Sequence, residues 1–305
     1  MTEVGRGNSD KLRIRVVTVC FAACSSCMLI VNKLAVKVLP APSVLLFFQL
    51  LSTTLSIACL SASQIVQLQR FELKFAAPYS LVAVAFLAAL YTNIKTLQYA
   101  NIETFIVFRS STPLLISVLD YICLGRELPS LRSTVCLIVL LLGSVVYVGT
   151  DSHFQVVAYK WVVCWYVVFC FDQIFIKHVV DSVKLSTWDR SLYTNSFALV
   201  PVLIVCFLKG EHAYFTQYLW TMTCATPVIL SCILGFCMSL ASFHLRSMVS
   251  ATYFTVLGTL CKILSVLINF FIWDEHASAV GIVSLFVCIA SASFYEQAPM
   301  RIIVK

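Results

Sequence analysis

The chain has 305 residues, of which 60% are hydrophobic and 11% are charged, and its formal net charge is +7. Its mean hydropathy of +0.94 excludes a soluble protein of this length, which could not bury so much apolar surface, and indicates a polytopic membrane protein. Most basic residues stand at the ends of apolar segments, a pattern of membrane topology rather than of nucleic-acid binding.

Apolar segments long enough for a bilayer, which needs about 20 residues, follow one another along the chain. The first segment comes after Lys11, Arg13 and Arg15 and carries no small-residue cleavage pattern, so we expect it to stay in the protein. The sequence thus predicts an all-α polytopic fold with about ten transmembrane helices. They cover residues 14–37, 43–63, 75–97, 102–124, 131–149, 156–177, 190–208, 222–243, 248–272 and 279–296.

The distribution of positive charge predicts the orientation of these spans. An even number of spans places both termini on one side of the membrane, and most lysines and arginines between spans fall on that side. By the positive-inside rule, both termini are expected in the cytosol.

The fourth and ninth predicted spans share a sequence pattern. Residues 104–108 and 117–119, with Glu127 and Ser130, align without gaps to residues 252–256 and 265–267, with Glu275 and Ser278. The repeat unit therefore holds five spans, residues 1–153 and 154–305, and an odd number inverts the second copy, as in many secondary transporters. Chance similarity between apolar helices is the alternative interpretation.

The ninth span carries a lysine, Lys262, near its middle. A lysine at the centre of a membrane helix costs about 2.5–3.5 kcal/mol on insertion scales, so it usually faces a polar cavity or a partner. Small and polar residues recur with it at helical spacing, on one face. They are Ala251, Thr255, Gly258, Ser265 and Asn269. This face predicts either a substrate cavity or a close helix–helix seam with one paired charge.

The fourth span carries a second cation, Arg109, at the matching depth. Two cations with few acidic residues at similar depth favour an anionic ligand such as a phosphate group, which arginine binds as a planar fork and lysine as a point charge. A structural role for Arg109, either pairing with Asp120 or Asp172 or binding helix carbonyls, is the alternative.

The seventh span opens with successive hydrogen-bonding side chains at Tyr193, Thr194 and Asn195. Such a group suits the edge of a nucleobase, although helix capping and packing would also explain it. The eighth span has a stripe of small residues, which is typical of close packing. The stripe consists of Ser231, Gly235, Ser239 and Ser242.

No enzyme, metal or cofactor motif is found. The 14 cysteines lie mostly inside apolar runs, where cysteine acts as a small hydrophobic residue, and the five histidines do not cluster. Metalloprotease, nucleophile-elbow and phosphate-loop patterns are absent, so we expect no enzyme activity and no cofactor.

Several stretches of the chain resemble the nucleotide-sugar transporters of the drug/metabolite transporter superfamily, and among them the Golgi GDP-sugar branch. The resemblance covers nearly the whole chain and is sharpest in residues 101–110, 176–180, 250–262, 266–269 and 273–274. It implies ten helices in two inverted halves. It also implies exchange of a cytosolic GDP-sugar, such as GDP-mannose or GDP-fucose, for luminal GMP across the Golgi membrane, by alternating access.

The family's motifs fall on named positions of this chain. Its guanine-reading F-Y-N-N motif falls on residues 192–195, and its sugar- and phosphate-contacting G-A-L-N-K motif falls on residues 258–262, with Thr194 and Cys261 in place of asparagines. Further positions match family residues around the base and sugar. They are Ser239 and Ser242, Asn32 with Lys33, and Phe21 and Phe254, which replace pocket tyrosines and leave Tyr253 adjacent.

The expected partners are a nucleotide sugar, a nucleoside monophosphate and the lipid bilayer, with a homodimer as one option and no nucleic acid. Two alternatives remain at this stage. One is another transporter of the superfamily, for UDP-sugars or for phosphorylated metabolites as in plastids. The sequence shows no transit peptide, which counts against a plastid transporter. The other is a membrane scaffold that kept the fold and lost transport.

Overall fold

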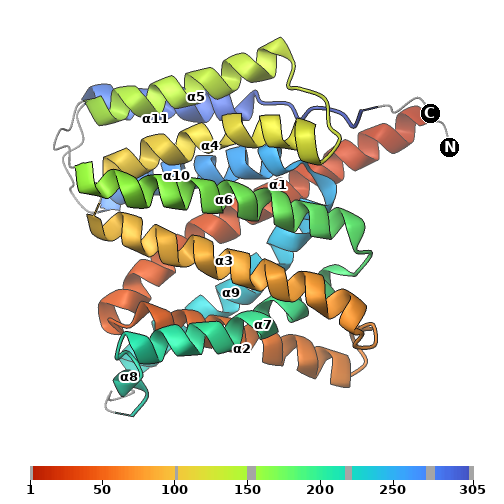
Figure 1. The fold of residues 1–305 in the computed structure, drawn as a ribbon, viewed down its shortest axis with the longest axis vertical. Helices are drawn as coiled ribbons and strands as arrows, with labels where there is room; N and C mark the ends of the chain where they lie inside the picture. Colours follow the sequence, from red (N-terminus) through yellow and green to blue (C-terminus); the bar gives the residue numbers. More distant parts are fainter. Residues whose placement is uncertain (1–2, 100–101, 150–155, 217–221, 273–278, 302–305) are drawn as a thin grey trace. The chain divides into compact units, whose positions relative to one another are not determined.

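The computed structural model describes residues 3–99, 102–149, 156–216, 222–272 and 279–301, and these ranges are almost entirely helical (Figure 1). The helices are α1 (Glu3–Val38), α2 (Pro42–Ala62), α3 (Leu73–Tyr99), α4 (Ile102–Cys123), α5 (Leu131–Gly149), α6 (Val156–Ser182), α7 (Thr187–Leu208), α8 (Ala213–Thr216), α9 (Met222–Met248), α10 (Ala251–Ile272) and α11 (Ala279–Ser293). Each predicted span overlaps one of them, and α8 is a single turn that the sequence did not predict.

The described part of the chain has the helices that a membrane protein needs. Within it, 6 stretches are long and apolar enough to cross a membrane. They are Leu12–Val38, Pro42–Ala62, Leu73–Asn93, Lys160–Ser182, Thr187–Leu208 and Ala225–Met248. Helices α5 and α10 contribute shorter apolar stretches, Leu131–Val146 and Ala251–Cys261. The prediction of an all-helical membrane protein is confirmed at this level.

The chain divides into two compact units, each made from both halves of the sequence. We call them the first unit (Met1–Leu87 with Val179–Met248) and the second unit (Ala88–His178 with Val249–Lys305). The two units differ from the two predicted repeats, residues 1–153 and 154–305, because the units group residues by contact and the repeats group them by sequence order.

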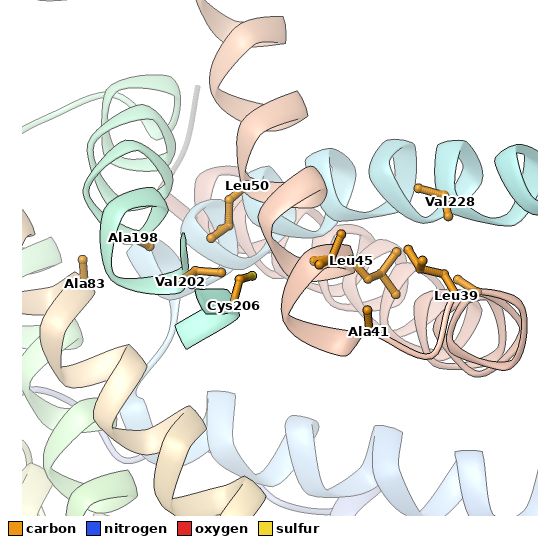
Figure 2. Packing of buried hydrophobic residues seen from close by; sticks show 11 residues of the cluster. Leu39, Ala41, Leu45, Leu50, Ala83, Ala198, Val202, Cys206 and Val228 are labelled. Atoms are coloured by element: carbon orange, nitrogen blue, oxygen red, sulfur yellow. The ribbon is translucent and has the colours of Figure 1, made fainter. Parts of the chain in front are cut away.

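In the first unit, α2 packs against α7 and α9, and α1 packs against α9. Figure 2 shows the buried cluster at these contacts, where Leu45 and Val202 lie among small residues such as Ala41 and Ala198. Lipid chains are as apolar as these side chains, so helices in a membrane associate through close van der Waals packing and hydrogen bonds. Small residues allow that close approach.

The ends of α2 and α7 are joined by carboxylates. After α7, Glu211 accepts hydrogen bonds from the backbone N–H groups of Ser43 (2.7 Å) and Val44 (3.4 Å) in the first turn of α2. At the start of α7, Asp189 forms a capping box with Ser186 and also accepts from the backbone N–H of Gln69, after α2, at 3.0 Å. Both carboxylates satisfy N–H groups left open by helix ends or loops. The start of each helix therefore lies near the end of the other, so α2 and α7 run antiparallel.

In the second unit, α4 packs against α5 and α10, and α11 packs against α5 and α10. Asp120, near the end of α4, accepts a hydrogen bond of 2.8 Å from the backbone N–H of Thr252 at the start of α10 and another from the Thr252 hydroxyl. The start of α10 thus lies at the end of α4, so these two helices are also antiparallel. Asp120 is only 2% exposed, and it fixes the position of α10 along α4.

Replacing Asp120 should destabilise the second unit. An Asp120→Ala change leaves two buried donors of Thr252 without their acceptor, which costs about 1–3 kcal/mol. We expect a lower apparent Tm, measured at one fixed scan rate, and a smaller fall for Asp120→Asn, which keeps one acceptor oxygen. The control is Glu127→Ala, since Glu127 is acidic but exposed. Equal Tm values for Asp120→Ala and Glu127→Ala would contradict this assignment.

Candidate functional site

The candidate residues fall into two groups, one in each unit. Helices α7 and α9 of the first unit carry those expected to read a base: Tyr193, Thr194, Asn195, Ser239 and Ser242. Helices α4 and α10 of the second unit carry those expected to bind phosphate and sugar: Arg109, Tyr253, Gly258 and Lys262.

Asn195 is the centre of a hydrogen-bond network between α7 and α9. Its Nδ2 atom donates to the Ser239 hydroxyl at 2.8 Å and to the backbone carbonyl of Ser191 at 2.7 Å, and it lies 3.2 Å from the Ser191 hydroxyl. The hydroxyls of Ser191 and Ser239 are 2.6 Å apart, so one donates to the other. The structure therefore brings together two of the candidate residues, Asn195 and Ser239. Ser191 adds a third member that the sequence analysis did not assign, although its spacing of four residues from Asn195 puts both on one helix face.

The other base-reading candidates of the first unit differ in their surroundings. Tyr193 is 7% exposed and its ring stacks against those of Tyr79 and Phe197, so it packs in an aromatic cluster. The Thr194 hydroxyl oxygen is buried and has no hydrogen-bond partner among the described residues. Ser242 is partly exposed, one turn after Ser239. Thr194 therefore has a hydroxyl that no described residue uses.

The rest of the small-residue stripe on α9 joins helices, as its composition predicts. The Ser231 hydroxyl donates to the Asn32 side-chain carbonyl on α1 at 2.6 Å, and the Gln49 amide on α2 donates to the same oxygen at 2.9 Å. A Cβ at Gly235 would lie 3.3 Å from the Cβ of Gln49, which shows how closely α2 and α9 approach there. Asn32 is therefore part of a link between three helices. The side chain of its neighbour Lys33 is not among those described.

In the second unit, Arg109 lies against the backbone of α10. A Cβ at Gly258 would be 3.9 Å from the Nη2 atom of Arg109, and the guanidinium carbon lies 5.0 Å from the ring centre of Phe169 on α6. Phe169 provides a cation–π contact that no sequence pattern pointed to. The Nε atom of Arg109 is buried and has no hydrogen-bond partner among the described residues.

Neither acidic residue proposed as a partner for Arg109 makes that pair in the described part of the chain. Asp120 is bound to Thr252 instead, and Asp172 accepts from the amide of Gln173 at 3.0 Å. The ion pairs among described residues do not involve Arg109. Arg109 is thus a cation next to helix backbone and an aromatic ring, with no carboxylate paired to it among the described residues.

Lys262 lies on α10, and its side chain is outside the described residues. It comes four residues after Gly258, so its backbone position is on the helix face that Arg109 approaches. Cys261 is 1% exposed and packs inside the unit. Tyr253 is partly exposed, with its ring 6.4 Å from that of Tyr295, and Phe254 and Phe21 are buried. Ser265 and Asn269, which belong to the predicted polar face of this span, lie outside the residues whose side chains are described.

Comparisons with known proteins place this chain among transporters. The model of the Triose-phosphate Transporter family matches residues 12–296. GDP-fucose transporter 1 of Arabidopsis thaliana is 36% identical over 91% of this chain and 84% of that protein. GDP-mannose transporter GONST3 of the same plant is 32% identical over 91% of this chain and 76% of that protein. A solved structure described as "Crystal structure of protein" has a TM-score of 0.70 at 13% identity, covering 92% of this chain and 96% of that one, and so shares the fold.

The space beside Gly258 gives a stability prediction for α10. An alanine there would meet Arg109 at ordinary contact distance, and Gly→Ala inside a helix stabilises it by about 1 kcal/mol. We expect an equal or higher apparent Tm for Gly258→Ala and a lower one for Gly258→Leu, whose side chain reaches the guanidinium. Gly143→Ala is the contrast, because its Cβ would lie 2.6 Å from the Cys288 sulfur. A Tm loss for Gly258→Ala as large as that for Gly143→Ala would contradict the placement of Arg109.

Proposed function

The chain belongs to the triose-phosphate transporter family, and from this we propose that it imports a GDP-sugar into the Golgi lumen in exchange for GMP, by alternating access. Whatever its sugar and its exchange partner, the chain is a nucleotide-sugar transporter and not an enzyme, since its family and relatives are transporters. The observation that carries the proposal is the 36% identity to a GDP-fucose transporter over 91% of the chain. The resemblance stated from sequence is thereby confirmed.

The cations of the second unit support phosphate as the common feature of both ligands. Arg109 has no acidic partner among described residues, and Lys262 follows on the same face of α10. A cation inside a membrane helix is unfavourable by about 2.5–3.5 kcal/mol on insertion scales unless an opposite charge or water compensates it. A GDP-sugar and GMP each carry roughly two negative charges near neutral pH, so the same cations would serve both directions of exchange.

The amide and hydroxyl groups of the first unit support recognition of a base. Asn195 is fixed by hydrogen bonds, and the Thr194 hydroxyl has no partner in the described part of the chain. Thr194 stands where the family has asparagine, so it offers one hydroxyl in place of an amide. We assign Thr194 and Asn195 to the base, Tyr193 to their support, and Ser242 and Gly258 to the ribose and sugar.

The helix contacts support the inverted repeat on which alternating access depends. Equivalent spans of the predicted repeat pack together: α2 with α7, α4 with α10, and α5 with α11. The end contacts at Glu211 and Asp120 make the first two pairs antiparallel. Antiparallel contact between equivalent helices is what repeats related by an axis in the membrane plane require. In this proposal residues 1–153 and 154–305 are the two repeats, and both termini lie in the cytosol.

Counterflow in liposomes tests the proposed exchange. Liposomes that contain the purified chain and are loaded with GMP should take up GDP-mannose or GDP-fucose faster than liposomes loaded with UMP or CMP. Uptake that ignores all three nucleotides would overturn the exchange.

The cations should be needed for this uptake. Loss of a charged hydrogen-bond partner of the phosphates weakens binding by about tenfold or more, so Lys262→Ala and Arg109→Gln should each slow counterflow at low substrate by at least that factor. The matched control is Lys184→Ala, which removes an exposed lysine between α6 and α7. Transport at the normal rate by Lys262→Ala would return this lysine to a structural role.

A further inference from the structure

We propose that Ser191 and Ser239 hold the Asn195 amide in one orientation, so that Asn195 reads the base only as a hydrogen-bond acceptor. This inference rests on the proposed function and deepens its base-reading part. It assigns a positioning role to Ser191, which lies outside the family motif, and to Ser239, which the resemblance had matched to a residue flanking the base and sugar.

The backbone carbonyl of Ser191 settles which end of the amide faces it. A carbonyl oxygen accepts hydrogen bonds and cannot donate them, so the Asn195 atom 2.7 Å away must be the NH₂ group. An amide turned by 180° would place two oxygens against each other. The orientation therefore follows from chemistry and not from an arbitrary choice between nitrogen and oxygen.

Both N–H groups of the Asn195 amide are used inside the protein. One donates to the Ser191 carbonyl, with the Ser191 hydroxyl also in range at 3.2 Å, and the other donates to the Ser239 hydroxyl at 2.8 Å. The bond between the two serine hydroxyls, 2.6 Å long, fixes them relative to each other. Ser191 is fully buried, so water does not compete for its contacts with Asn195. Asn195 has no donor left for a ligand.

The Asn195 side-chain oxygen remains open. No described residue donates to its Oδ1 atom, and Asn195 keeps 7% of its surface exposed. The hydroxyl of Thr194, three residues after Ser191 on the same face of α7, is buried and also without a partner in the described chain. The network thus leaves the Asn195 oxygen as an acceptor, and Thr194, the preceding residue of α7, has a hydroxyl that can donate.

This pattern complements one edge of guanine. Guanine presents two neighbouring donors, N1–H and the 2-amino group, beside the acceptor O6. The Asn195 oxygen has two lone pairs and can accept from both donors, while the Thr194 hydroxyl can donate to O6. Hypoxanthine, the base of IMP, lacks the 2-amino group and loses one of these bonds. A fixed acceptor therefore predicts a preference for GMP over IMP.

The test is the ratio of GMP affinity to IMP affinity, measured by thermal stabilisation of the purified full-length chain over a range of each nucleotide. A ratio within one variant does not depend on the folded fraction, so a partly unfolded variant still gives an answer. The wild-type ratio should be about tenfold, the value of one good hydrogen bond. Ser239→Ala and the double variant Ser191→Ala with Ser239→Ala should lower it at least threefold.

Three variants separate a positioning role from a direct contact. Ser239→Thr keeps the hydroxyl, so its ratio of GMP affinity to IMP affinity should equal that of the wild type. Ser247→Ala, an exposed serine on α9 bonded to the carbonyl of His244, should leave it unchanged. In an Asn195→Leu background, Ser239→Ala should have no further effect on the ratio, because the amide that it positions is gone.

The outcomes distinguish this inference from the proposed function. A ratio that stays at the wild-type value in Ser239→Ala and in the double variant, while both nucleotides lose affinity equally, would overturn the inference and make Ser239 a ribose contact. A wild-type chain that is not stabilised by GMP at all would overturn the proposed function itself.

Discussion

The structure of the second unit depends on a positive charge that its described residues do not balance. Arg109 lies beside the backbone of α10 at Gly258 and over the ring of Phe169, while the nearest candidates for a counter-ion, Asp120 and Asp172, are bound elsewhere. A guanidinium in that position requires an anion or water, because a membrane helix supplies neither. Gly258 of α10 has no side chain to occupy the space beside Arg109, and Lys262 comes one turn later on the same helix. We propose that the phosphate of the ligand is this anion.

In the first unit the proposed ligand group is a neutral base, which we expect neutral side chains to bind. Several of the unit's polar side chains join helices by hydrogen bonds: Ser231 links α9 to α1, and Ser239 links α9 to α7. In a membrane such links replace the hydrophobic effect as a source of helix association, and they also fix polar groups in place. The few groups left over, the Asn195 oxygen and the Thr194 hydroxyl, are then available for a ligand at defined positions.

Much of the fold could be predicted from sequence because the bilayer imposes one length and one composition on every span. Helices such as α2 and α7 differ from their predicted bounds by a few residues at most. The single turn α8 was missed, since four residues carry no periodic signal. The contacts between α4 and α10 and the division into two units were not predicted, because apolar helices give no pattern that says which neighbours they pack against.

For the site, sequence located the residues but not their roles. Lys262 and Arg109 stood out because charge is rare in membrane helices. The alternative that Arg109 pairs with Asp120 could not be dismissed from sequence, because the bond between Asp120 and Thr252 at the start of α10 depends on how the helices pack. Tyr193 was expected at a base and packs against Tyr79, a contact between residues more than a hundred positions apart. Ser191 and Phe169 were missed, because a serine on a helix and an aromatic ring in an apolar run are ordinary until their neighbours are known.

The most direct test of this account is an experimental structure of the full chain with GMP bound. We expect the phosphate of GMP within hydrogen-bond distance of the Arg109 guanidinium. A structure in which Arg109 pairs with a carboxylate of the protein while GMP binds elsewhere would contradict it.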